Sequence, residues 1–119
     1  IYQGDLVLTL EKIARTYFQF AQRNPTFYRL QLSMYFAPPV SESYQAIHPY
    51  AQAQHEMLEE VFRQAANDHG NLQGRHKRYA TGFLGVINGM IGLNLHDELE
   101  CDDEVVYQAV HQFMYGIFS

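Results

Sequence analysis

The sequence predicts an all-α domain in which five to six helices pack as an orthogonal bundle. Apolar residues recur at spacings of three and four along every long segment, and no segment shows the sustained alternation that marks a half-buried strand. Leu, Ile, Val and Phe supply 32 of the 119 residues, which suits a single domain with a sizeable core. We therefore expect one helical domain over residues 1–119.

The first two helices are predicted over residues 5–23 and 25–36. Asp5 is a suitable N-cap for the first helix, because its carboxylate can accept from a free backbone N–H of the first turn. Asn24 and Pro25 then end this helix and begin the next, since proline suits the first helical position. A pair of prolines ends the second helix.

The third and longest helix is predicted to open at Ser41 and to extend to about residue 68. Pro49 lacks an N–H and clashes with the preceding turn, so we expect a kink or a break after His48. Gly70 is expected to cap the C-terminal end.

The last two helices are predicted over about 75–95 and 103–118, joined by a polar, acidic connector over 96–103. Asp102 or Asp103 is expected to cap the last helix, where acidic residues complement the helix dipole.

Four glycines mark one face of the fourth helix. Gly82, Gly85, Gly89 and Gly92 are spaced by three, four and three residues, and each costs about 0.8–1 kcal/mol relative to alanine in a helix. A compensating gain is close approach of another helix. We expect a second copy of the chain there; the alternative is packing on the last helix of the same chain. The predicted dimer interface comprises Gly82, Gly85, Val86, Gly89, Gly92, Val110, Phe113, Met114 and Ile117.

Aromatic and polar side chains share the predicted inner faces. Apolar walls with a few polar tips describe a small-molecule pocket, although tyrosine at helical spacing also serves as core. Asn88 lies inside an apolar helix and needs a partner, which could be a dimer mate, a ligand or another helix of the chain. The predicted ligand-binding residues are Tyr17, Phe20, Tyr35, Tyr44, His48, Phe62, Tyr79 and Asn88.

No catalytic signature, cofactor motif or metal-ligand spacing is present, so we expect neither an enzyme nor a metal protein. His55 and Glu59 are interpreted as an ordinary pair on a helix surface. A net charge of −5 argues against nucleic-acid binding by this segment itself. The longest apolar stretch has thirteen residues, too few for a membrane span, and the single Cys101 fits a reducing, cytoplasmic setting.

The order of three motifs resembles the C-terminal ligand-binding and dimerisation domain of tetracycline-repressor-type (TetR-family) transcriptional regulators. Residues 17–30 (YFQFAQRNPTFYRL) are similar to the family's helix–Asn-Pro–helix joint. Residues 83–93 (FLGVINGMIGL) are similar to its penultimate helix, and residues 113–117 (FMYGI) to the end of its last helix. The likeness covers nearly the whole chain.

The resemblance implies an all-α domain whose last two helices pair with their twofold mates as a dimeric four-helix bundle, and whose inner helices surround an effector cavity. It also implies DNA binding only through an N-terminal helix-turn-helix head, which is absent from this chain. Because the sequence begins with Ile1 rather than Met, we expect it to be part of a longer protein. A rival interpretation is a dimeric helical interaction module without an effector.

Overall fold

The computed structural model describes the backbone of residues 2–118 and, within that range, all side chains except those at positions 71, 117 and 118. The regular structure of this part of the chain is helical, with five α-helices and no strand, which confirms the predicted all-α class. Its elements are α1 (Leu6–Arg23), α2 (Pro25–Tyr35), α3 (Glu42–Ala65), a short 3₁₀ turn (Gly70–Leu72), α4 (His76–Leu95) and α5 (Asp103–Phe118).

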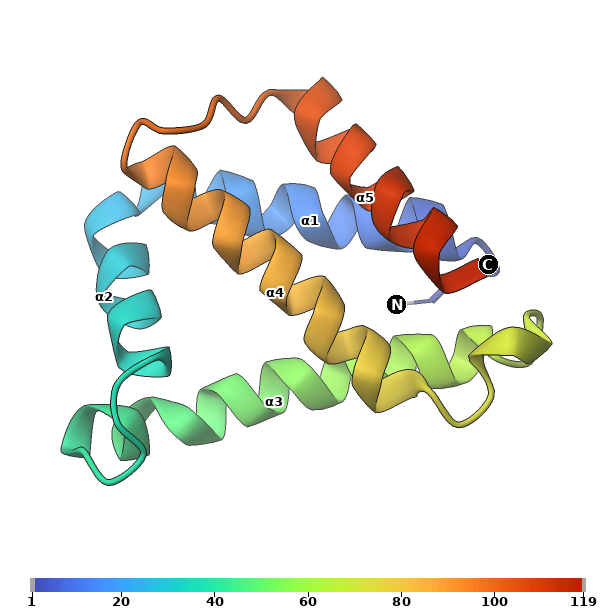
Figure 1. The fold of residues 1–119 in the computed structure, drawn as a ribbon, viewed down its shortest axis with the longest axis horizontal. Coiled ribbons are helices and arrows are strands. Elements are labelled where there is room, and N and C mark those ends of the chain that lie inside the picture. Colours follow the sequence, from blue (N-terminus) through green and yellow to red (C-terminus); the bar gives the residue numbers. More distant parts are fainter. Residues whose placement is uncertain (1, 119) are drawn as a thin grey trace.

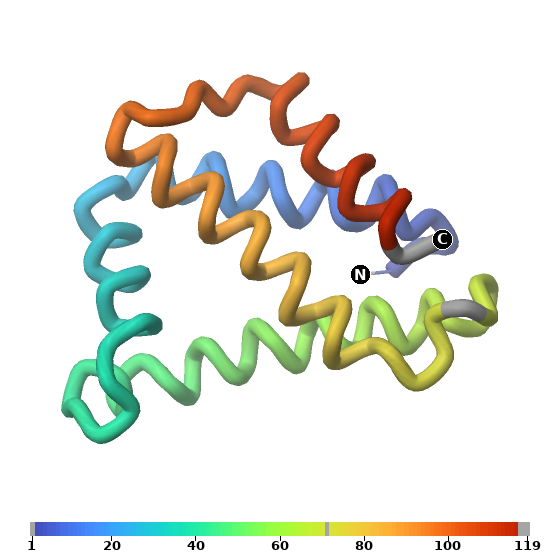
Figure 2. The backbone as a smooth tube through the Cα atoms, viewed as in Figure 1, coloured from blue at the N-terminus to red at the C-terminus, as the bar shows by residue number. Residues whose placement is uncertain are grey.

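Helices α2 and α4 run across the direction that α1 and α3 share (Figure 1). Helices α1 and α3 run along the long axis of the view, α2 joins them at one end, and α4 passes diagonally over both. Helix α5 returns beside α4 and packs chiefly on α1. The backbone trace shows how the connector between α4 and α5 turns the chain back across α1 (Figure 2).

The core lies between these crossing helices and draws on all five of them. Its largest fully buried side chains come from α1, α2, α3, the 3₁₀ turn, α4 and α5, and include Leu6, Leu10, Tyr28, Leu58, Phe62, Leu72, Phe83, Ile87, Ile91 and Val110. None of the helices described is long and apolar enough to cross a membrane.

Local capping fixes where three helices begin, as the sequence predicts. Asp5 Oδ1 accepts from the Leu8 N–H at 3.0 Å, and Ser41 Oγ accepts from the Tyr44 N–H at 3.1 Å. Of the two candidates for the last helix, Asp102 is the cap: its Oδ1 accepts from the Val105 N–H at 2.9 Å. Each cap satisfies one of the free N–H groups of a first helical turn.

Two details of the third helix differ from expectation. A kink or a break is expected at Pro49, and the break does not occur, because α3 continues as one helix from Glu42 to Ala65. Proline removes only its own backbone donor, and the turns on either side keep theirs. Gly70 does not cap α3, which ends at Ala65; instead it opens the 3₁₀ turn that leads toward α4.

Helix α2 is tied to α4 by two polar contacts. The buried Tyr28 hydroxyl donates to Asn88 Oδ1 at 2.7 Å, and the Arg29 guanidinium donates to the Leu95 carbonyl at the C-terminal end of α4. Burial also raises the pKa of Tyr28, so the phenol stays a donor at neutral pH. The partner of Asn88 is therefore another helix of the same chain.

We expect Tyr28→Phe to lower the free energy of unfolding by about 1–2 kcal/mol, because it leaves the partly buried Asn88 amide without its partner. Thermal and urea unfolding measure the change. Tyr50→Phe is the matched control, since the Tyr50 side chain is 69% exposed. Equal stability losses in the two variants would contradict a stabilising role for the Tyr28–Asn88 bond.

Candidate functional site

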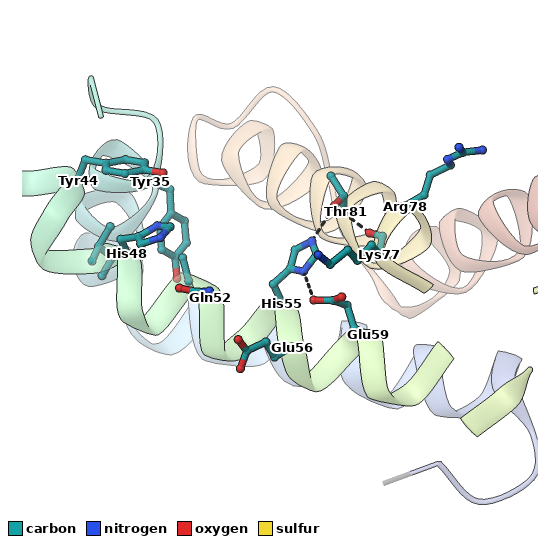
Figure 3. Close-up of a pocket in the computed structure, with 12 residues that line it drawn as sticks. Tyr35, Tyr44, His48, Gln52, His55, Glu56, Glu59, Lys77, Arg78 and Thr81 are labelled. Atoms are coloured by element: carbon teal, nitrogen blue, oxygen red, sulfur yellow. Dashed lines mark hydrogen bonds and ion pairs between the residues drawn. The ribbon is translucent and has the colours of Figure 1, made fainter. Parts of the chain in front are cut away.

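A pocket of about 730 Å³ opens between the end of α2, one face of α3 and the first turns of α4 (Figure 3). Its volume falls in the range of small-molecule sites, roughly 300–1,000 Å³. The lining residues are Tyr35 from α2, then Tyr44, Ile47, His48, Ala51, Gln52, His55, Glu56 and Glu59 from α3, and Lys77, Arg78 and Thr81 from α4.

Helical spacing places the α3 side chains in one row. Tyr44, His48, Gln52, His55 and Glu59 follow one another at four, four, three and four residues, so they share one face of the helix. Gln52, His55 and Glu59 occupy the second half of α3, where the first turns of α4 cross it. The row therefore gives the pocket two ends of different chemistry.

The first end is aromatic. The rings of Tyr44 and His48 stack with their centroids 5.2 Å apart and an interplanar angle of 23°. Tyr35 stands opposite on α2 and donates to Gln54 Oε1 at 3.1 Å. Burial raises the pKa of Tyr35, so its hydroxyl stays protonated at neutral pH. This end offers flat apolar surfaces with a few polar tips.

The second end is polar and joins α3 to α4. His55 Nδ1 lies 2.9 Å from Glu59 Oε2, and His55 Nε2 lies 2.7 Å from Thr81 Oγ1. The Thr81 hydroxyl also lies 3.0 Å from the Lys77 carbonyl oxygen, to which it donates. His55 thus bridges a nearly buried carboxylate on one helix and a hydroxyl on the next.

The charge state of Glu59 follows from its neighbours. The hydrogen bond from His55 lowers the pKa of Glu59, and the positive charges of His55, Lys77 and His76 lower it further, while burial opposes them. The carboxylate is therefore held ionised and serves as an acceptor.

Three of the predicted ligand-binding residues, Tyr35, Tyr44 and His48, come together in this pocket. Tyr17 instead lines a separate cavity of about 420 Å³ against α1, where burial raises its pKa to about 12. Phe20 is 41% exposed and packs edge-on against Phe27 outside both cavities.

The remaining predicted ligand-binding residues serve the packing of the chain. Phe62 is fully buried in the core, and the half-buried Tyr79 rests on it with ring centroids 5.9 Å apart. Asn88 is held by Tyr28. Phe62 therefore lies on the buried face of its helix, as expected, and packs in the core; a role of Phe62 in ligand binding stays a prediction.

Sequence reasoning missed the polar end of the pocket. It interpreted His55 and Glu59 as a surface pair and assigned no binding role to Lys77 or Thr81. The sequence does contain a signal for this end of the pocket: Glu59 lies at helical spacing from Tyr44 and His48, so the three residues share one face of the helix. Thr81 lies 26 residues from His55, so only the crossing of α3 and α4 brings the two together.

The four glycines of α4 have different surroundings at the ends and in the middle of their stripe. A Cβ at Gly82 would lie 3.3 Å from Phe113 Cε1, and one at Gly92 would lie 3.8 Å from Leu32 Cδ1, so both ends of the stripe serve contacts within the chain. A Cβ at Gly85 or Gly89 would meet none of the described atoms within 4 Å. The described residues therefore leave the middle of the stripe open.

The open stripe adjoins a groove of about 400 Å³ between α4 and α5, lined in part by Val86 and Phe113. Val110 and Met114 do not belong to this surface: they are 1% and 2% exposed, within the core of the single chain. Their inclusion in the dimer interface was wrong, because that side of α5 packs inward. The side chain of Ile117 lies outside the described residues.

The described residues give little support for a metal site or a reactive thiol. No group of three or more His, Cys, Asp or Glu side chains there could hold a metal ion. Burial and the nearby Asp102 raise the pKa of the Cys101 thiol, which disfavours the reactive thiolate.

Comparison with known proteins finds no family model that matches the chain, no similar curated protein and no similar solved structure.

We expect the stabilising contribution of Glu59 to depend on pH in a defined direction. Its folded pKa is lowered from the ordinary value of 4.5, so its contribution is full above that value and is lost as the pH falls through the depressed folded pKa. The difference in unfolding free energy between the native protein and Glu59→Gln should shrink as the pH falls from about 5.5 to about 3. Urea unfolding across this range measures it; a difference that grows toward acid pH would contradict the paired carboxylate.

Proposed function

We propose that this chain is the effector-sensing and dimerisation domain of a TetR-type transcriptional regulator. In this proposal a small molecule binds the pocket between α2, α3 and α4, and its binding changes the DNA affinity of N-terminal helix-turn-helix heads. The chain acts as a homodimer and is not an enzyme.

One observation carries the proposal: the same helix supplies a wall of the pocket and the open glycine face. Lys77, Arg78 and Thr81 line the pocket at the first turns of α4, and the glycine stripe begins one residue later at Gly82. A ligand that shifts the start of α4 would therefore also shift the surface expected to meet a second chain. A dimer that is controlled by a ligand requires this kind of structural connection between the ligand pocket and the dimer interface.

A homodimer through α4 and α5 is supported by open space and by helix energetics. Gly85 and Gly89 each cost α4 about 0.8–1 kcal/mol relative to alanine, and none of the described residues uses the space that they leave. A second copy of α4 would use it, because two backbones can approach closely where no side chain intervenes. With α5 beside α4, the twofold mates would form the four-helix bundle that the sequence resemblance implies.

The proposed mechanism is a shift between two arrangements of the dimer. Two heads must sit about 34–36 Å apart to contact successive turns of DNA. An effector that binds one arrangement more tightly than the other changes DNA affinity by that difference in its own affinity. His48 and Tyr44 would sense the effector on α3, and α4 would transmit the change to the dimer face.

A dimeric interaction module without an effector is the second candidate. The exposed apolar side chains of α2 favour it: Phe27 and Leu30 are 52% and 57% exposed, which is typical of a surface that binds another protein. The two candidates differ in whether the pocket binds small molecules.

The first test is the oligomeric state. Light scattering coupled to size exclusion should give twice the mass of one chain, and Gly85→Leu should reduce it to the mass of one chain. A Cβ added at Gly85 would meet none of the described atoms of the same chain within 4 Å, so a loss of the dimer in this variant would report on the partner.

Ala53→Leu, on an exposed side of α3, is the matched control and should remain dimeric. A native protein that is monomeric at high concentration, or a Gly85→Leu dimer of unchanged stability, would contradict the assigned interface.

The second test concerns the pocket. Compounds that raise the melting temperature of the native protein in a screen should lose most of that shift in Tyr44→Ala and His48→Ala. Tyr50→Ala is the control, because Tyr50 is exposed and lies outside the pocket. In the intact regulator with its DNA-binding heads, the same two substitutions should abolish the compound's effect on operator affinity. A screen without any stabilising compound would favour the interaction module.

A further inference from the structure

We propose that the second cavity, between α1 and α3, binds a small neutral molecule with an apolar body and one hydrogen-bond acceptor, such as a diaryl ketone. Leu8, Ile13 and Met57 would contact the apolar body, and the Tyr17 hydroxyl would donate to the acceptor. This cavity shares no lining residue with the pocket between α2, α3 and α4, so a ligand here is independent of the function proposed above.

The cavity has the size of a small-molecule site. Its volume is about 420 Å³, within the range of roughly 300–1,000 Å³ that is typical of such sites. Met57 comes from α3, and its flexible thioether can adapt to apolar ligands of different shape. The other lining residues come from α1 and the residues just before it: Gln3, Asp5, Leu8, Thr9, Lys12, Ile13, Thr16 and Tyr17.

Helix α1 turns a second, partly apolar face toward the cavity. The cavity side chains follow at a spacing of four in two adjacent rows, at positions 8, 12 and 16 and at positions 9, 13 and 17. Leu8 is 44% exposed, and Ile13 and Tyr17 are only partly buried. An apolar ligand in the cavity would remove this surface from water. The fully packed core of α1 lies on the neighbouring face, with Leu6, Leu10, Ala14, Phe18 and Ala21.

The two threonine hydroxyls of the wall are already engaged. Thr9 Oγ1 donates to the Asp5 carbonyl at 2.7 Å, and Thr16 Oγ1 donates to the Lys12 carbonyl at 2.9 Å. Each hydroxyl has a single proton, so neither threonine can donate to a ligand without giving up its bond to the helix.

Tyr17 supplies the free donor of this wall. Its hydroxyl makes no hydrogen bond to another described residue. Burial, with a smaller contribution from Tyr35, raises the pKa of Tyr17 to about 12, so the phenol keeps its proton at neutral pH. A partly buried donor without a partner gains a hydrogen bond when a ligand carbonyl enters.

The charged side chains favour a neutral ligand. Asp5 and Lys12 are the charged residues that line the cavity, and their formal charges cancel. Both side chains are exposed, so a neutral molecule can bind while their charged ends stay in water. An ionised ligand would instead lose hydration and meet one charge of each sign.

The test uses benzophenone, with diphenylmethane as the analogue of similar shape that lacks the carbonyl acceptor, and measures both dissociation constants by titration calorimetry. We expect benzophenone to bind about fivefold more tightly, which is the effect of one neutral hydrogen bond. Tyr17→Phe should remove this preference and leave binding of diphenylmethane unchanged. Tyr50→Phe is the matched control and should keep the preference, because Tyr50 is exposed and lines neither cavity.

A second measurement locates the bound compound. Irradiated benzophenone attaches covalently to C–H groups that it contacts, so sequencing of the labelled peptides identifies its neighbours. We expect the label on Met57 or on the cavity face of α1, at Leu8 or Ile13.

Four results would overturn the inference: no binding of either compound, equal affinity for the two, a preference that survives in Tyr17→Phe, or a label confined to residues of the first pocket. Tighter binding of the anion 4-benzoylbenzoate, reversed by Lys12→Gln, would refute the neutral class. The proposed regulator function would survive each of these results. A monomeric native protein, in turn, would refute that function and leave this site intact.

Discussion

The need to cover α4 determines how the other helices are arranged. This helix carries apolar side chains around most of its circumference, and Ala80, Phe83, Ile87, Ile91 and Leu95 are buried in the single chain. Helices α1, α2 and α3 each pack against it, and α5 packs on α1 beside it. A helix of this kind is stable only when it is covered on nearly all sides. Gly85 and Gly89 leave one strip of α4 that none of the described residues covers.

The pocket is a consequence of the same arrangement. Because α3 crosses α4 near the first turns of α4, the row from Tyr44 to Glu59 meets Lys77 and Thr81 at one end and the aromatic side chain of α2 at the other. The Tyr28–Asn88 bond and the Arg29 contact hold α2 to α4. A ligand in the pocket therefore touches two bodies, α3 on one side and the joined α2 and α4 on the other.

The sequence predicted the helices and their caps well because those signals are local. Asp5, Ser41 and Asp102 each bond to an N–H three residues onward, so nearby residues suffice to identify them. The partner of Asn88 lies 60 residues away, and several partners were plausible from the sequence. Phe62 faces inward as the sequence predicts, but helical spacing alone does not distinguish an inward side chain in the core from one that lines a cavity. The contact between His55 and Thr81 required knowing where two helices cross.

The contact between Gly82 and Phe113 constrains how this protein can vary during evolution. Any side chain at position 82 would have to share the space of the Phe113 ring, which packs in turn on Phe62 and Phe83. Relatives with alanine or serine at position 82 should therefore carry a smaller residue at position 113, and the two positions should covary. Positions 85 and 89 meet no such neighbour among the described residues, so glycine retained there across relatives would reflect selection by a partner molecule.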